Sequence, residues 1–210
     1  MPRDLKSQDD AEEEDVDYDP ARLTAHRRRR RQRIVQAAIE LIEERDYETV
    51  QIRDVAVRAG VALGTVYRYF SSKDHLYAAA LAEWGAGVVP HLGPGGVQAA
   101  TDAERLRSVL LRVVDSHRQW PQMMRAEMIL ERSSDPNSKV LLQQFSQRYD
   151  SAILSTLRDI SPTNAEAVAY MVQSVMYRAL RGWAVGRCTI ADVERYAGQA
   201  VDLIFSPPPN

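Results

Sequence analysis

The 210-residue sequence has one cysteine, no long apolar run and a formal net charge of only −2. Cys188 has no second cysteine to pair with, which excludes an intramolecular disulfide and a metal site of several thiolates. No uninterrupted apolar run approaches the ~20 residues that span a bilayer, and acids occupy the N-terminus where a secretory signal has apolar residues. We therefore expect a soluble, cytoplasmic protein with no membrane partner.

The sequence also lacks the local motifs of catalysis and metal binding. Its four histidines are scattered without metal-ligand spacing, and it has no glycine-rich phosphate loop. Cys188 fits the role of a small packing residue near a helix end better than that of a nucleophile. We therefore predict no catalytic residues, no cofactor and no metal site, with an enzyme of unknown class as a distant alternative.

Charges are divided unevenly along the chain. Residues 1–20 carry two bases and nine acids, residues 21–80 carry twelve bases and seven acids, and the remainder is neutral. We expect residues 1–25 to form a disordered acidic tail, because a segment without apolar periodicity has little to bury. The small net charge therefore conceals a basic segment and does not argue against a nucleic-acid partner.

Five consecutive arginines, Arg27 to Arg31, form the most basic part of this segment. Dense fixed positive charge favours phosphate, because each neutralised phosphate releases condensed counterions. A solvated helix start explains an isolated arginine run equally well. The residues after the run decide between these two interpretations.

Apolar spacing predicts three helices from the arginine run onward. The stretch 28–45 carries apolar residues at three- and four-residue intervals, and the stretch 51–59 repeats the pattern until a glycine ends it. The stretch 61–70 is too short to be stable alone, but its Val66 and Phe70 can face back onto the preceding helix. Two short helices around a glycine-containing turn are typical of a helix-turn-helix DNA-binding motif.

Several short motifs occur together after the first helix. They are Arg-Asp-Val-Ala from Arg53, Ala-Gly-Val from Ala59, Gly64, and a Tyr-Arg-Tyr-Phe run followed by Ser and Lys. With these motifs, the segment 47–81 resembles the DNA-binding domain of the TetR family. The resemblance implies a three-helix DNA-binding domain over residues 26–88 and a homodimer that binds a palindromic double-stranded DNA operator.

The resemblance assigns the third helix to the major groove of the operator. Gly64 would let the backbone approach the DNA closely, and Thr65, Tyr67 and Tyr69 would meet bases and phosphates. Arg68 would reach a guanine edge or, equally well, another phosphate. We expect the hydroxyl groups of the two tyrosines to be the main phosphate anchors.

Further DNA contacts are implied on either side of that helix. Gln51 and Arg53 lie near the N-terminus of the second helix, where amide groups and the helix dipole favour a phosphate. Lys73, at the start of a fourth helix, corresponds to a phosphate clamp. Arg28, Arg29, Arg30 and Arg31 would form an arm toward the minor groove or the flanking backbone.

Ala62 and Leu63 depart from the family pattern, which often has Ser or Lys just before the glycine of the third helix. Neither side chain donates a hydrogen bond to a phosphate, although Leu63 can contact a thymine methyl group. We therefore expect a larger share of the DNA affinity to come from the arginines.

The second half of the chain also has helical spacing. The stretch 85–100 is rich in glycine and proline, which predicts a connection that separates the DNA-binding domain from the second half. Apolar stripes recur over residues 100–206, and no segment alternates like a strand, so we predict an all-α chain of about nine helices. The resemblance implies that residues 100–206 bind a ligand and that the last two helices form the homodimer interface.

The resemblance further implies a pocket for a hydrophobic small-molecule effector among the middle helices. Methionine and aromatic side chains adapt to a bulky apolar ligand, but the same residues fill the core of many helical bundles. Composition does not separate a cavity from a filled core. The candidate lining residues are Trp120, Met123, Met124, Met128, Phe145, Tyr149, Met171 and Met176.

Within the family, the stretches 50–53, 64–70 and 181–183 are similar to KstR-type repressors of sterol catabolism. This similarity implies repression that is relieved by a sterol-derived acyl-CoA or another lipid, with activation as an alternative outcome. A regulator of drug or xenobiotic efflux is the alternative function, and acids in the pocket would favour it. Glu127 and Glu131 are the candidate acids, but glutamates are more often solvated, so the sequence leaves this open.

We predict that replacing Arg28 to Arg31 with alanine flattens the dependence of DNA affinity on salt, by up to about one unit of slope per arginine. The physical reason is that fewer counterions are released on binding. Fluorescence anisotropy at several salt concentrations measures the slope of log affinity against log salt. An unaltered slope would refute the role of these arginines.

Overall fold

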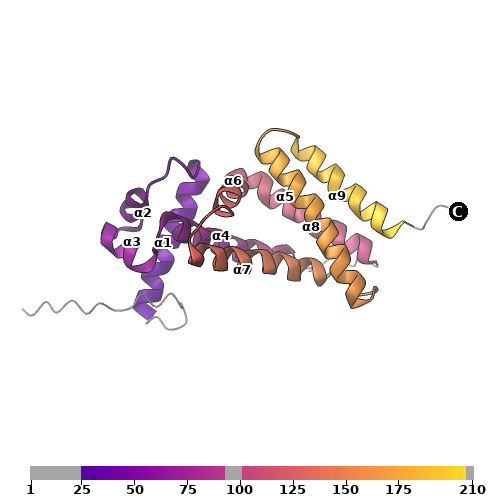
Figure 1. The fold of residues 1–210 in the computed structure, drawn as a ribbon, viewed down its shortest axis with the longest axis horizontal. Coiled ribbons are helices and arrows are strands. Elements are labelled where there is room, and N and C mark those ends of the chain that lie inside the picture. The colour runs from indigo at the N-terminus through magenta and orange to yellow at the C-terminus, as the bar shows by residue number, and fades with distance from the viewer. Residues whose placement is uncertain (1–24, 93–100, 207–210) are drawn as a thin grey trace, which may run out of the picture.

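The computed structural model describes residues 25–92 and 101–206, and within these ranges it contains nine α-helices and no strand. The prediction of an all-α chain with about nine helices is confirmed (Figure 1). The expected acidic tail lies, apart from Ala25, outside the described residues. The helices are α1 (Ala25–Glu44), α2 (Ile52–Ala59), α3 (Leu63–Tyr69), α4 (Lys73–Leu92), α5 (Asp102–Gln119), α6 (Pro121–Leu130), α7 (Pro136–Leu154), α8 (Pro162–Ala184) and α9 (Ile190–Phe205).

Helices α1, α2 and α3 form an N-terminal head, as the apolar spacing predicts. The side chain of Asp54 accepts a hydrogen bond from the Gln51 amide at 3.1 Å, which caps the start of α2. Gly60 ends α2 in the left-handed conformation, with φ of 65°, where a side chain would be strained. Val66 and Phe70 are fully buried in the core that α1 and α2 share, so their predicted inward orientation is confirmed.

Prolines mark the starts of three helices in the second half. Pro121, Pro136 and Pro162 begin α6, α7 and α8. Proline suits this position because its missing amide hydrogen would have no partner within the helix, and its fixed φ is already helical. Proline therefore marks the start of each of these helices without interrupting it.

Helix α4 corrects one expectation from the sequence. The glycine- and proline-rich connection predicted for 85–100 does not begin at Gly85, because α4 continues to Leu92, and residues 93–100 lie outside the described part. A Cβ atom on Gly85 would come within 2.5 Å of Phe145 Cε2 on α7. Gly85 is therefore a close-packing residue rather than a helix breaker.

Two hydrophobic cores share the helices α6 and α7. The first core contains the buried residues of α1 to α4 together with Met123 and Phe145. The second core contains those of α5, α8 and α9 together with Met124 and Ile153. α4 and α7 also lie side by side along the molecule, so the head packs against the second half through these two helices (Figure 1).

A polar contact joins the turn between α3 and α4 to the start of α7. Asp135 caps α7 by accepting hydrogen bonds from the Asn137 and Ser138 amides. Its other oxygen accepts from the hydroxyl groups of Ser71, at 2.9 Å, and Ser72, at 2.5 Å. One carboxylate therefore ties the residues after α3 to a helix of the second half.

The α4–α7 packing generates a stability prediction. Gly85→Ala should lower the free energy of unfolding by about 1–3 kcal/mol, because the added methyl group overlaps the Phe145 ring. Gly87→Ala is the matched control on the same helix, since its Cβ would meet nothing within 4 Å. There we expect the ordinary gain for Ala over Gly, up to about 1 kcal/mol. Urea unfolding measures both, and equal gains in the two variants would contradict the packing role.

Candidate DNA-binding surface and ligand cavity

The outward side of α3 carries most of the residues predicted to touch DNA. Leu63 and Tyr67 are 44% and 50% exposed, and Ala62, Gly64 and Arg68 are exposed as well. Thr65 and Tyr69 are partly buried. A Cβ on Gly64 would meet nothing within 4 Å, so the fold itself does not require this glycine. The face is open to a partner, and the head lies at the opposite end of the molecule from α9 (Figure 1).

Two further predicted contacts lie at the start of α2. Gln51 is the exposed residue before the helix, and Arg53 is exposed in its first turn, 3.9 Å from Asp54. The amides of a helix N-terminus and a nearby arginine both favour an anion. This geometry fits the predicted phosphate contact.

The arginine run lies in the first two turns of α1 and not in an extended arm. Successive residues of an α-helix point about 100° apart, so five neighbours cannot share one face. Arg28 and Arg29 are exposed, whereas Arg30 and Arg31 are partly buried. The Arg31 guanidinium lies 5.2 Å from the centre of the Phe70 ring, and burial lowers its pKa. Arg31 therefore also packs against the core of the head.

Lys73 has an intramolecular partner. Its ammonium group donates a hydrogen bond to the Tyr47 carbonyl at 2.5 Å and lies 4.2 Å from the centre of the Tyr47 ring. Burial lowers the pKa of this side chain, which is partly covered. A DNA phosphate would have to compete with these contacts, so the predicted clamp remains a prediction.

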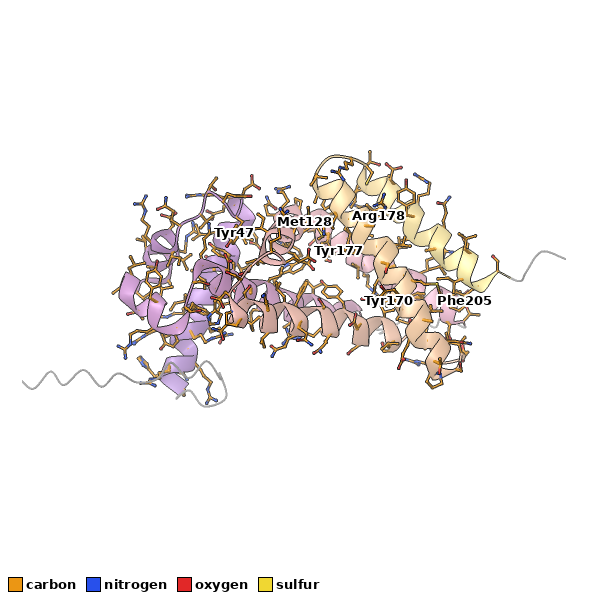
Figure 2. All side chains as sticks on the ribbon, viewed as in Figure 1. Tyr47, Met128, Tyr170, Tyr177, Arg178 and Phe205 are labelled. Carbon is orange, nitrogen blue, oxygen red and sulfur yellow. The ribbon has the colours of Figure 1, made fainter. Side chains whose placement is uncertain are left out.

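A cavity of about 350 Å³ lies among α5, α6, α7 and α8. Tyr177 lies between α8 and α6, with Tyr170 further along α8 (Figure 2). Four of the eight predicted lining residues are in the wall, namely Met124, Phe145, Tyr149 and Met176.

The other four predicted lining residues lie elsewhere. Trp120 packs edge-on against Trp84, with 6.1 Å between ring centres, and Met123 is buried in the first core. Met128 packs against the second core, and Met171 is 48% exposed. The cavity face of α8 follows a three- and four-residue spacing through Tyr170, and Met171 is turned about 100° from that face.

Sequence reasoning missed most of the lining on α5 and α8 and left its acids undecided. The missed residues recur at three- and four-residue intervals along one face of each helix, and this spacing is the sequence signal that could have identified them. They are Leu110, Val113, His117, Tyr170, Gln173, Ser174, Tyr177 and Leu180. Glu127 and Glu131 also line the cavity, so the two candidate acids belong to its wall.

The two acids of the wall differ in their partners. Glu131 accepts hydrogen bonds from the Tyr177 hydroxyl and from Arg181, the latter at 3.2 Å. Burial, followed by the nearby charge of Glu131, raises the pKa of Glu127 to about 8. At neutral pH most Glu127 side chains are therefore protonated and uncharged.

Two more polar groups in the wall are buried. The Tyr149 hydroxyl has no hydrogen-bond partner among the described residues. His117 donates from Nδ1 to the Val113 carbonyl at 2.8 Å, and burial lowers its pKa. The cavity is thus mostly apolar with a few polar groups, which is typical of a small-molecule site.

Apolar side chains remain exposed on the last two helices. Tyr170 and Val175 of α8, and Tyr196 and Leu203 of α9, are between 37% and 82% exposed. No described helix is both long enough and apolar enough to cross a membrane. Within the described residues, no group of His, Cys, Asp and Glu side chains has the arrangement of a metal site.

Comparisons with known proteins agree with this architecture. Residues 34–80 match the family model of bacterial regulatory proteins, tetR family, and residues 100–204 match the tetracyclin repressor-like C-terminal domain. The HTH-type transcriptional repressor KstR of Rhodococcus jostii (strain RHA1) is 30% identical over 178 residues, covering 84% of this chain and 82% of that protein.

Solved structures show the same fold. A TetR transcriptional regulator from Rhodococcus sp. RHA1 has a TM-score of 0.73 at 24% identity, covering 88% of this chain and 100% of that one. FadR from Bacillus subtilis, in complex with stearoyl-CoA, has a TM-score of 0.63 at 19% identity, covering 83% and 97%. The matched families consist of transcriptional regulators and not enzymes, as the sequence predicts. The chain belongs to the TetR family of bacterial regulatory proteins.

Proposed function

We propose that the chain is a cytoplasmic, ligand-responsive transcriptional repressor that binds a palindromic operator as a homodimer and is released by an apolar effector. One observation carries this proposal: α7, a wall of the cavity, is bound through Asp135 to the serines after α3. Residues 26–88 would bind DNA, and residues 100–206 would bind the effector and dimerise. The acidic tail before them would compete with DNA for the arginines by intramolecular electrostatics.

In the proposed complex α3 enters the major groove. The exposed Tyr67 and Arg68 are the side chains of α3 best placed to reach bases and phosphates. Gly64, which has no side chain, permits a close approach of the backbone to the DNA. Arg28, Arg29, Gln51 and Arg53 would contact the flanking backbone. The proposed DNA contacts also include Arg30, Arg31, Ala62, Leu63, Thr65, Tyr69 and Lys73.

The proposed dimer uses the exposed apolar side chains of α8 and α9. One α3 helix gives too little discrimination, whereas two copies read half-sites about one helical turn apart. Packing of α8 and α9 against their copies would form a four-helix interface and cover side chains such as Leu203, which is 82% exposed in the single chain.

Release follows if the effector binds only one of two arrangements of the dimer. In the proposal these arrangements differ in the spacing of the two heads, and only one spacing fits the operator. The free energy of operator binding is then weakened by at most the difference between the ligand's binding free energies for the two arrangements. In each chain, α7 would connect ligand binding to the head, because it lines the cavity and contacts both α4 and the α3–α4 turn.

A lipid acyl-CoA, including a sterol-derived one, is the effector class that we favour. Its support is the similarity to a KstR repressor and to FadR, whose structure contains stearoyl-CoA, together with the mostly apolar cavity wall. The acidic wall residues Glu127 and Glu131 favour a second candidate, a regulator of xenobiotic efflux that responds to cations.

The proposal predicts sequence-specific binding to the region upstream of the chain's own gene. In gel shifts at moderate salt, one fragment should shift, and long-chain acyl-CoAs or sterols should release it, whereas cationic dyes should not. Arg68→Ala should weaken binding by about 10- to 100-fold. Arg187→Ala, an exposed arginine in the turn between α8 and α9, is the control that should bind normally. If no upstream fragment shifts, the regulator function is contradicted.

The proposed dimer interface generates a second prediction. Leu203→Asp should convert the dimer to a monomer at micromolar concentration, because it places two charges in an apolar interface. Val57→Asp on α2 is the matched control, since Val57 is 81% exposed and lies outside the interface. Sedimentation velocity measures both variants. A monomeric wild-type protein, or a dimeric Leu203→Asp variant, would rule out this interface.

A further inference from the structure

One hydroxyl group in the cavity wall is left unpaired by the fold. The Tyr149 hydroxyl is buried and has no hydrogen-bond partner among the described residues. Burial raises its pKa far above neutrality, so it remains a hydrogen-bond donor at every physiological pH. A buried polar group without a partner costs free energy, and native structures rarely leave one without a role. A ligand atom in the cavity would supply the missing partner.

Glu127 is a second polar group of the same wall. Burial raises the pKa of its carboxyl, as does the charge of Glu131, and no described residue donates a hydrogen bond to it. Glu127 and Tyr149 line the same cavity, and the charge of Glu127 raises the pKa of the tyrosine further. With its pKa near 8, the carboxyl carries a proton at neutral pH and can donate it in a hydrogen bond.

The neighbouring polar groups are already engaged. Tyr177 and Arg181 of α8 donate hydrogen bonds to Glu131, and neither donates one to Glu127. His117 of α5 uses its Nδ1 proton on the Val113 carbonyl. Of these buried groups, the Tyr149 hydroxyl and the protonated Glu127 therefore keep a donor without a partner among the described residues.

The rest of the wall restricts the body of the ligand. Besides the polar side chains of Ser146, Tyr170, Gln173 and Ser174, it contains seven side chains without hydrogen-bonding atoms, which favour a hydrocarbon. These side chains are Leu110, Val113, Met124, Phe145, Ile153, Met176 and Leu180.

We propose that Glu127 and Tyr149 together bind the carbonyl or hydroxyl oxygen of an uncharged, otherwise apolar part of the ligand. This inference rests on the proposed function and narrows its effector to a neutral oxygen-bearing hydrocarbon group, such as an acyl carbonyl. A carboxylate ligand would face the charge of Glu131, and an ammonium ligand would leave the Tyr149 donor unpaired. The site therefore selects against both kinds of charged head group.

Four twelve-carbon probes that differ only in the head group test this site. They are 2-dodecanone, 1-dodecanol, dodecylammonium and dodecanoate, and their Kd values are measured with the full chain by displacement of the neutral dye N-phenyl-1-naphthylamine. We expect the ketone and the alcohol to bind at least about tenfold more tightly than either ion, as the loss of about one buried hydrogen bond implies.

Substitutions then assign the selectivity to the two residues. Tyr149→Phe should weaken ketone binding about tenfold, whereas Glu127→Gln should weaken it little, because the amide still donates a hydrogen bond. Tyr77→Phe is the matched control, since the Tyr77 hydroxyl is also buried without a hydrogen-bond partner among the described residues but lies outside the cavity wall, so Kd should be unchanged. Thermal unfolding establishes that each variant is folded.

Three results would overturn the inference. In the first, dodecylammonium binds most tightly and the Glu127→Gln substitution abolishes its binding. In the second, all four probes bind equally well in the wild-type protein and in the Tyr149→Phe variant. In the third, no probe binds. Gel shifts with operator DNA are scored separately. If the ketone binds as expected but never releases DNA, the ligand site stands and the proposed regulatory function fails.

Discussion

The packing of α4 against α7 is the contact on which the rest of the structure depends. Gly85 lets the Phe145 ring lie where any larger residue would place its Cβ, and the same ring belongs to the first core and to the cavity wall. Because α4 begins directly after α3 and its turn, this contact connects the cavity with the head through one continuous helix. Close-packed helices transmit a displacement because they have no free volume to absorb it.

Asp135 adds a second, polar connection at the head end of α7. It caps its own helix and accepts from Ser71 and Ser72, so the start of α7 and the end of the α3 segment share one carboxylate. Next to it, burial lowers the pKa of His75 to about 4, and the neutral ring accepts a hydrogen bond from the Ser71 amide. The turn after α3 is therefore held from both α4 and α7.

The sequence predicts those features that local spacing determines. Val66 and Phe70 lie four residues apart and are buried together, and Gly60 ends α2, because a helix has a fixed period and a left-handed position favours glycine. Contacts between distant segments leave no such local signal. The composition around Gly85 favours a break because its packing partner, Phe145, lies far along the chain. The family resemblance assigns Lys73 to a phosphate, although the carbonyl of Tyr47 lies within 2.5 Å in space.

The lack of a local signal for contacts between distant segments also explains why half of the predicted cavity residues lie elsewhere. Residue type alone does not distinguish Met171 from Met176, whereas the helical face does, because only Met176 shares the face of Tyr177 and Leu180. In the proposed mechanism a ligand oxygen binds Tyr149, whose ring lies 5.0 Å from that of Phe145, one turn earlier on α7. The ligand then acts on the residue that packs against Gly85. A hydrocarbon lacking the oxygen would fill the cavity without satisfying Tyr149, and would therefore have less binding free energy to shift the two heads.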